Sequence, residues 1–198
     1  MNSLRIALVA ALSFASSALA DYRFDAASNA CRNEAGEVGL NAGARGPCAD
    51  LRHQDLEGVR FDSMDLRGAS FEGANLKGAS FLGAELSGAS FRNANLNKAS
   101  LRGAKLSAAR FENAKLINAQ LEHARLDGAT FANADLRNAC LFKARFDRAD
   151  VRGARFSQDR SLVDNANWMG AIVDADTLPF TIAELATLNV QLMQVASR

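Results

Sequence analysis

The chain has 198 residues, of which 48% are hydrophobic and 7% aromatic, and its formal net charge is +1. This length predicts one domain, and the balanced charge excludes a global electrostatic attraction to nucleic acid or to an acidic surface. Because the sequence has only two prolines and no long polar tract, no large disordered region is expected.

Residues 1–20 have the features of a secretory signal peptide. Arg5 precedes an apolar run at 6–14, and small residues lead to Ala18-Leu19-Ala20, so that Asp21 is the expected mature N-terminus. A short buried helix or a membrane anchor is the alternative, but the run is shorter than the ~20 residues that cross a bilayer. We therefore expect a periplasmic or secreted protein without a membrane span.

Residues 21–48 are expected to form an N-terminal cap. Cys31 and Cys48 flank a Gly-rich stretch, and an oxidising compartment would let them form a disulfide. The alternative is two unpaired thiols. A bridge closing so short a loop stabilises a segment with little core of its own by about 3 kcal/mol.

A period of five residues begins at Cys48. A large apolar residue recurs at 22 consecutive positions from Leu51 to Phe156, and Ala stands two residues before it 18 times in succession, from Ala69 to Ala154. The helical period of 3.6 and the strand period of 2 both fail to produce this pattern. The sequence therefore predicts an internal repeat.

Physical chemistry indicates how one repeat unit is arranged. Two residues separated by one extended residue point to the same side of the chain, so the Ala and the large residue are both expected inside. The Gly or Asn two places after the large residue suits a tight turn, because both tolerate a positive φ. Such a unit buries its apolar face only by stacking on copies of itself, which predicts a β-solenoid.

These units resemble the pentapeptide-repeat family, whose repeat is A-[ND]-L-x-x. Examples are Ala74-Asn75-Leu76-Lys77-Gly78 and Ala134-Asp135-Leu136-Arg137-Asn138. Over residues 49–156, the resemblance implies an all-β fold, the right-handed quadrilateral β-helix, with four repeats in each coil. Residues twenty apart would then stack on one side, which separates Phe71, Phe91, Phe111 and Phe131 from a neighbouring column of Leu.

The C-terminal end is expected to differ from the repeats. At 157–180 the phase breaks and resumes with Trp168 twelve residues after Phe156, which predicts an irregular insertion, a final partial coil, and Trp168 over the end of the core. Residues 181–198 predict a capping helix, because Thr181 and Glu184 form a capping box before an apolar stripe. The family resemblance also implies a homodimer through this helix.

The residues that carry chemistry are scattered. No zinc-ligand spacing, phosphate-binding loop or nucleophile elbow is present, so we expect no cofactor, no metal and no enzyme activity. Basic residues gather toward the end of the repeats instead. The candidate interaction surface consists of Lys105, Arg125, Arg145, Arg148 and Phe142. Its alternative is an ordinary solvated face, on which Asp127 and Asp147 compensate the arginines.

The expected function is an exported, non-catalytic scaffold that binds an unknown protein partner. The family resemblance implies one alternative, a DNA mimic that inhibits or protects DNA gyrase, and the export signal leaves a second one open, a secreted effector. DNA mimicry requires a strongly acidic rod, whereas residues 49–156 carry 17 basic and 13 acidic side chains. DNA mimicry is therefore disfavoured. Nucleic acid is not an expected partner either, because the net charge of the chain is close to zero.

Overall fold

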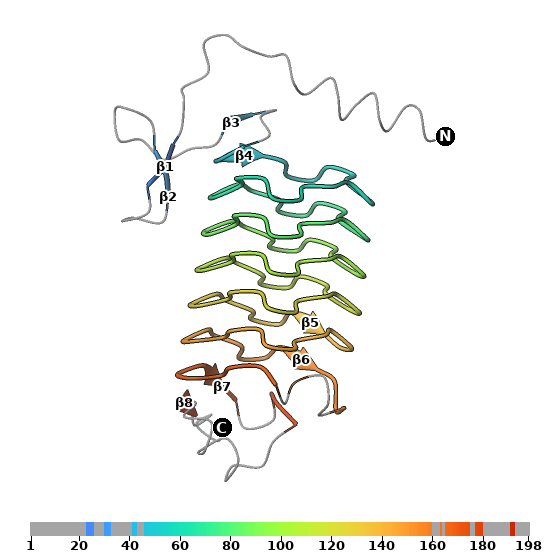
Figure 1. The fold of residues 1–198 in the computed structure, drawn as a ribbon, viewed down its shortest axis with the longest axis vertical. Helices are drawn as coiled ribbons and strands as arrows, with labels where there is room; N and C mark the ends of the chain where they lie inside the picture. The colour runs from blue at the N-terminus through green and yellow to red at the C-terminus, as the bar shows by residue number, and fades with distance from the viewer. Residues whose placement is uncertain are drawn as a thin grey trace, which may run out of the picture.

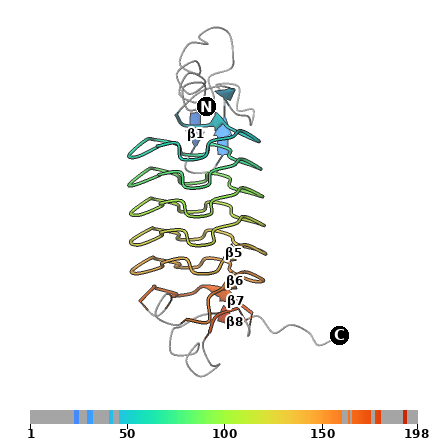
Figure 2. The same ribbon diagram turned by 90° about the vertical axis from the view of Figure 1, so that its right-hand side faces the viewer.

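The computed structural model describes residues 23–25, 30–32, 41–42, 46–159, 163, 165–174, 177–179 and 191–192. The described chain winds into a rod of stacked coils (Figure 1). Figure 2 shows the same regular stack from a direction 90° away, with the C-terminal segments β7 and β8 at the end opposite β1. The expected signal peptide at 1–20 lies outside the described residues, and export stays a prediction.

Parallel bridges connect each coil to the next with a spacing of twenty residues, which confirms the expected coil length. One series runs from Asp50 through Ser70, Ser90, Arg110 and Thr130 to Asp150. The paired strands β5 (Asp135–Leu136) and β6 (Arg155–Phe156) have the same spacing. Each coil therefore has four sides, and the residue numbers on one side rise by twenty.

We number the four sides by the large inward residues that stack on them. The first side holds Leu51, Phe71, Phe91, Phe111, Phe131 and Val151, and the second holds Leu56, Leu76, Leu96, Leu116, Leu136 and Phe156. The third holds Phe61, Phe81, Leu101, Leu121 and Leu141, and the fourth holds Leu66, Leu86, Leu106, Leu126 and Phe146. All of these residues are buried, as is every Ala of the repeat from Ala69 to Ala154.

The turn between two sides explains the residue preference after each large residue. In one such turn the N–H of Ala74 donates to the carbonyl of Phe71 at 3.0 Å. The second turn residue, here Gly73, has a φ of +66°, as the third residue of a type II turn requires. Residues other than Gly and Asn also adopt this conformation, among them Ala108 at +55° and Arg148 at +59°.

The Asp or Asn before many of the large residues supports the turn that follows. Its side chain accepts a hydrogen bond from the backbone N–H two residues later, which belongs to the first turn residue. Arg137 donates in this way to Asp135 Oδ1 at 3.2 Å, and Met169 donates to Asn167 Oδ1 at 3.0 Å. This role in an Asx turn gives the Asp or Asn of the repeat a structural function.

Aromatic rings from opposite sides meet across the core of the N-terminal half. Phe71 and Phe91 stack within the first side, with ring centroids 5.0 Å apart. Phe81 of the third side lies between them edge-on, 5.5 Å from Phe71 and 5.7 Å from Phe91. Both stacked and edge-to-face pairs are favourable geometries for aromatic rings, so this part of the core has no open interior.

At the C-terminal end the spacing between coils grows from twenty to 22 residues. Arg145 bridges to Asn167, and Asp150 bridges to Ile172. Strand β7 (Ile172–Val173) continues this last coil and pairs in parallel with β8 (Gln191–Leu192). The capping helix expected over 181–198 is therefore wrong at Gln191–Leu192, where backbone pairing with β7 replaces helical bonding. The rest of that segment, and with it the expected homodimer contact, lies outside the described residues.

The N-terminal end carries a small hairpin beside the rod. Strands β1 (Arg23–Asp25) and β2 (Ala30–Arg32) pair antiparallel, and β3 (Asn41–Ala42) pairs in parallel with β4 (Ala49–Asp50). The expected disulfide is present and joins Cys31 of β2 to Cys48, with a Cα–Cα distance of 5.7 Å. The hairpin is thereby tied to the first coil.

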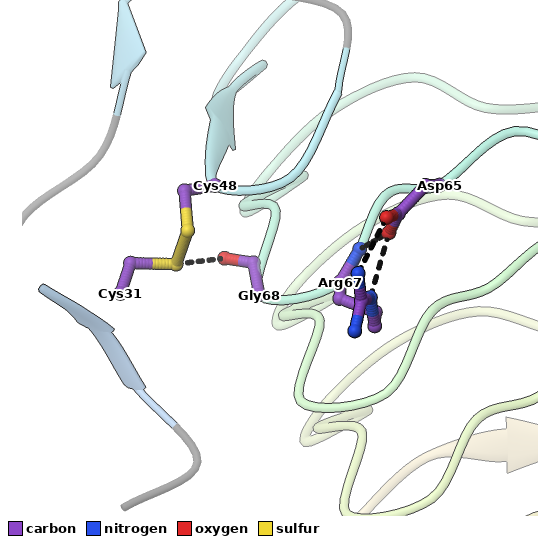
Figure 3. Close-up of a disulfide and its surroundings, with 5 residues drawn as sticks. All are labelled: Cys31, Cys48, Asp65, Arg67 and Gly68. Carbon is purple, nitrogen blue, oxygen red and sulfur yellow. Dashed lines mark hydrogen bonds and ion pairs between the residues drawn. A yellow bond between two sulfur atoms is a disulfide. The ribbon is translucent and has the colours of Figure 1, made fainter. Parts of the chain in front are cut away.

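The hairpin packs on the rod at Gly68 (Figure 3). Cys31 Sγ lies 3.4 Å from the carbonyl oxygen of Gly68, and a Cβ built on Gly68 would lie 2.5 Å from that sulfur and 2.8 Å from the ring of Phe24. The guanidinium of Arg67, held by two hydrogen bonds to Asp65, lies 5.9 Å from the centroid of the Phe24 ring. A residue without a side chain is therefore required where the hairpin meets the rod.

Candidate interaction surface

The expected basic row is a continuous column on the fourth side of the rod. Asp65, Glu85, Lys105, Arg125 and Arg145 are bridged in sequence from coil to coil. The column changes from acidic to basic along the rod, as the sequence indicates. The remaining question is whether its cations are free to meet an anionic partner.

Carboxylates of the same side neutralise the three cations. Lys105 Nζ contacts Glu85 Oε1 at 2.5 Å. Arg145 Nη2 lies 3.1 Å from Asp127 Oδ1 and 2.8 Å from Asp147 Oδ2, while Arg125 Nε lies 3.7 Å from Asp127 Oδ2. The hydrogen bond that Arg145 donates to Asp147 and the charge of Asp127 raise the pKa of Arg145 above its usual range. The row is therefore internally compensated and is not an array of free positive charges.

Arg148 lies in the turn that follows the fourth side, one coil before Met169. Its backbone N–H donates to the carbonyl of Met169 at 3.0 Å, and no ion pair to Arg148 is found within the described residues. Its Cγ would lie 3.4 Å from a Cβ at Gly170, so the aliphatic part of the side chain covers that glycine. Among the expected cations, Arg148 is the one without a carboxylate partner in the described part of the chain.

A surface hollow of about 660 Å³ opens beside these residues. It is lined by Asp127, Gly128, Arg145, Asp147, Arg148, Met169 and Gly170. Met169 is 52% exposed, so an apolar side chain lies at its rim. Oδ2 of Asp127 and Oδ1 of Asp147 are buried but accept no hydrogen bond from the described residues. Because these two oxygens are buried, the exposed side chains that the hollow presents to an outside group include Arg148 and Met169.

Phe142, the fifth expected surface residue, lies away from this hollow. It stands in the turn after the third side and is 44% exposed. The ring of His123 meets it edge-on at 5.8 Å, and Lys143 Nζ lies 5.1 Å from its centroid. The structure thus brings Lys105, Arg125, Arg145 and Arg148 together along the fourth side, and places Phe142 on a separate ridge.

The described residues contain no group of three or more His, Cys, Asp or Glu side chains that could hold a metal ion. Within the same residues, no helix has the length and hydropathy that crossing a membrane requires. Cys140 is the free cysteine there, and it is partly exposed on the third side. The hollow is lined by carboxylates, guanidinium groups and an exposed Met169, which can bind polar, charged and apolar groups.

The sequence matches the family model described as Pentapeptide repeats in eight copies. The matched segments are residues 48–83, 69–107, 84–122, 104–141 and 119–158. Together they span the regular coils, from the disulfide at Cys48 to the end of the twenty-residue spacing. Among curated proteins, none matches the sequence of the chain.

Solved structures of pentapeptide repeat proteins resemble the rod. Rfr23 from the cyanobacterium Cyanothece 51142 is 25% identical with a TM-score of 0.52, over 57% of this chain and 88% of that one. QnrB1, a plasmid-mediated fluoroquinolone resistance protein, is 18% identical with a TM-score of 0.33, over 74% of this chain and 68% of its own. A protein from the thylakoid lumen of Arabidopsis thaliana is 26% identical with a TM-score of 0.24, over 75% and 85% of the two chains.

Proposed function

Because the chain belongs to the pentapeptide repeat family and shares its right-handed β-helix, we propose that it acts as an exported, non-catalytic module that binds a protein partner. The interior supports a binding role. Every large inward residue from Leu51 to Phe156 is buried, so the rod has no internal pocket along these coils. Recognition therefore takes place on outward side chains, as in other solenoids.

The hollow at Arg148 is the proposed contact, and the exposed side chains of Arg148 and Met169 that line it together are the observation that carries it. Arg148 has no ion pair among the described residues, so an acidic group of the partner would pair with it, and an apolar side chain would cover Met169. Asp127 and Asp147 line the same hollow and disfavour a uniformly anionic polymer. The expected partner surface therefore combines an acidic group with an apolar one.

Export is supported by the composition of residues 1–20 and by the disulfide. Disulfides form and persist in oxidising compartments, and the one between Cys31 and Cys48 ties the hairpin to the first coil. Cleavage after Ala20 would remove Arg5 and leave 22 basic and 22 acidic residues. The mature rod would then carry no net charge.

Site-specific photo-crosslinking in cells tests the contact. A photoreactive residue replaces Met169, and the same residue at Arg110, which is exposed on the first side, is the matched control. We expect one defined adduct from position 169 only, and its loss when Arg148→Glu is added. Equal adducts from both positions, or none, would overturn the hollow as the binding site.

Cell fractionation with sequencing of the mature N-terminus tests export separately. We expect the chain in the periplasm or the medium, starting at Asp21. Full-length protein recovered with the chromosome would overturn export and favour the alternative role at DNA gyrase. A supercoiling assay with and without a fluoroquinolone then measures that role directly, and transfer into a host or competitor cell measures the secreted-effector alternative.

A further inference from the structure

The ridge between the third and fourth sides has a sequence that complements itself when reversed. Its first turn position reads Leu82, Arg102, Glu122 and Phe142 in successive coils. Leu82 is 49% exposed and Phe142 44%, so both ends of the series are apolar and open. The two residues between them carry opposite charges.

The central ion pair of this ridge is incomplete within one chain. Arg102 Nε lies 3.9 Å from Glu122 Oε2, which is too far for a hydrogen bond. Glu122 Oε2 is buried and accepts no hydrogen bond from the described residues. The Arg102 side chain is 55% exposed, so its guanidinium keeps N–H groups that a carboxylate outside the chain can reach.

We propose that a second copy of the chain packs against the third side and this ridge, antiparallel to the first. The two-fold axis is perpendicular to both rods and passes between them, at the height midway between the coils of Arg102 and Glu122. Arg102 of each copy then faces Glu122 of the other, and Leu82 faces Phe142. Two ion pairs thus form at the centre of an isologous interface, with two apolar contacts outside them.

Residue sizes fit the same register. The second turn position carries Gly83 and Gly103 in one half, followed by His123 and Lys143 in the other. Reversal places each large side chain of one copy over a glycine of the other. Along the third side itself the bridged column reads Ser80, Ser100, Gln120 and Cys140, so that Ser80 faces Cys140 and Ser100 faces Gln120.

Other arrangements of two copies fit less well. With parallel rods, Arg102 would face Arg102 and Glu122 would face Glu122, and like charges across an interface are costly.

The hairpin leaves this ridge open, since its contact with the rod is at Gly68, after the fourth side. On the far edge of the third side the antiparallel register sets Lys77 opposite Arg137. Each keeps its own carboxylate, Glu57 at 3.5 Å and Asp135 at 2.6 Å.

The contact is small. Four coils at about 4.8 Å each extend about 19 Å along the rod, and stable interfaces bury about 800 Å² on each partner. We therefore expect a weak dimer whose population rises with protein concentration. It does not depend on the proposed partner site, because the hollow at Arg148 lies after the fourth side.

A disulfide trap tests the register. In Ser80→Cys the introduced thiol faces Cys140 of the second copy, so mild oxidation with copper phenanthroline should give covalent dimers on a non-reducing gel. Arg110→Cys, on the opposite side of the rod, is the matched control and should stay monomeric. Wild type should also stay monomeric, because Cys140 is three coils from the Cys140 of the second copy. Bridging of wild type, or equal bridging of both variants, would overturn the antiparallel register.

Charge exchange tests the pairing without oxidation. Arg102→Glu and Glu122→Arg should each weaken association about tenfold or more in sedimentation equilibrium, since each change places two like-charged pairs in the interface. The double variant restores opposite charges and should regain wild-type association. Thermal unfolding of all three variants checks that the rod stays folded. Equal association by wild type and both single variants, or no association of wild type at any concentration, would overturn the proposal.

Discussion

Phe146 and Trp168 stack with ring centroids 4.3 Å apart and ring planes inclined by 14°, although 22 residues separate them instead of twenty. Trp168 nevertheless continues the inward column of the fourth side, because Asn167 before it bridges to Arg145. Its Nε1–H donates to the carbonyl of Val163 at 3.3 Å, and Phe156 meets it edge-on at 5.6 Å. One large ring thus covers the last regular coil.

Trp168→Ala should therefore destabilise the rod by about 3–5 kcal/mol, as replacement of large buried aromatic residues by Ala does. Met169→Ala is the matched control, because its neighbouring side chain is exposed and its loss should change the unfolding free energy by less than about 0.5 kcal/mol. Urea unfolding measures both. Similar values for the two variants would contradict the role of Trp168 as the end of the core.

Gly68→Ala should release the hairpin from the rod. The new Cβ would meet Cys31 and Phe24, and overpacking of this kind typically costs about 1–3 kcal/mol. Gly78→Ala is the control, because Gly78 has nearly the same φ but no atom within 4 Å of the added Cβ. Hydrogen exchange of residues 23–32 should rise in Gly68→Ala only, and equal exchange in both variants would contradict the packing.

Ala108→Gly should stabilise the rod by about 1 kcal/mol, because Ala108 holds a φ of +55° that L-residues with a Cβ adopt at a cost. The reverse change one coil side earlier, Gly103→Ala, should destabilise by a similar amount, since Gly103 has a φ of +64° and free space around it. Thermal unfolding compares the two. Shifts of the same sign would contradict this account of the turn.

Acid should weaken the rod through carboxylates such as Asp135. Hydrogen bonds from the Arg137 side chain hold the pKa of Asp135 below its ordinary value of 3.8, against the opposing effect of burial. The unfolded chain therefore binds the proton more readily, and this stabilisation is complete above pH 3.8 and is lost as the pH falls below it.

The unfolding temperature should therefore fall less between about pH 5 and pH 3 in Asp135→Asn than in wild type, because the variant lacks this titrating group. A scan at several pH values measures the difference. Identical acid dependence of the two proteins would contradict a contribution from this pair.

The repeat could be predicted from the sequence because every unit has the same five-residue pattern of an Ala and a large apolar residue. The inward positions and the turn at the second residue after each large one follow from one local pattern, and the twenty-residue stack of Phe71 on Phe91 follows from the four repeats per coil that the family resemblance implies. The outward position of Phe142 beside His123 follows from the same stacking rule.

The features at the ends could not be predicted in the same way. The contact of Phe24 and Cys31 with Gly68 joins segments without any shared period. In the candidate surface, the column of cations was predictable, but pairing of Arg145 with both Asp127 and Asp147 depends on rotamers that a residue pattern does not determine. The helix expected at 181–198 rested on a local capping box and on apolar spacing, and at Gln191–Leu192 the free edge of β7 provides backbone partners instead.

The ladder of bridges at twenty-residue spacing also governs how such a gene can change length. Deleting four units would shorten the rod by about 4.8 Å and return every later residue to its own side. Deleting a single unit would keep the core intact but turn all later outward residues by a quarter of the circumference. Arg145 would then no longer continue the column of Glu85. Gain or loss of whole coils therefore keeps each outward residue in its column, whereas gain or loss of single repeats moves the later outward residues to other columns.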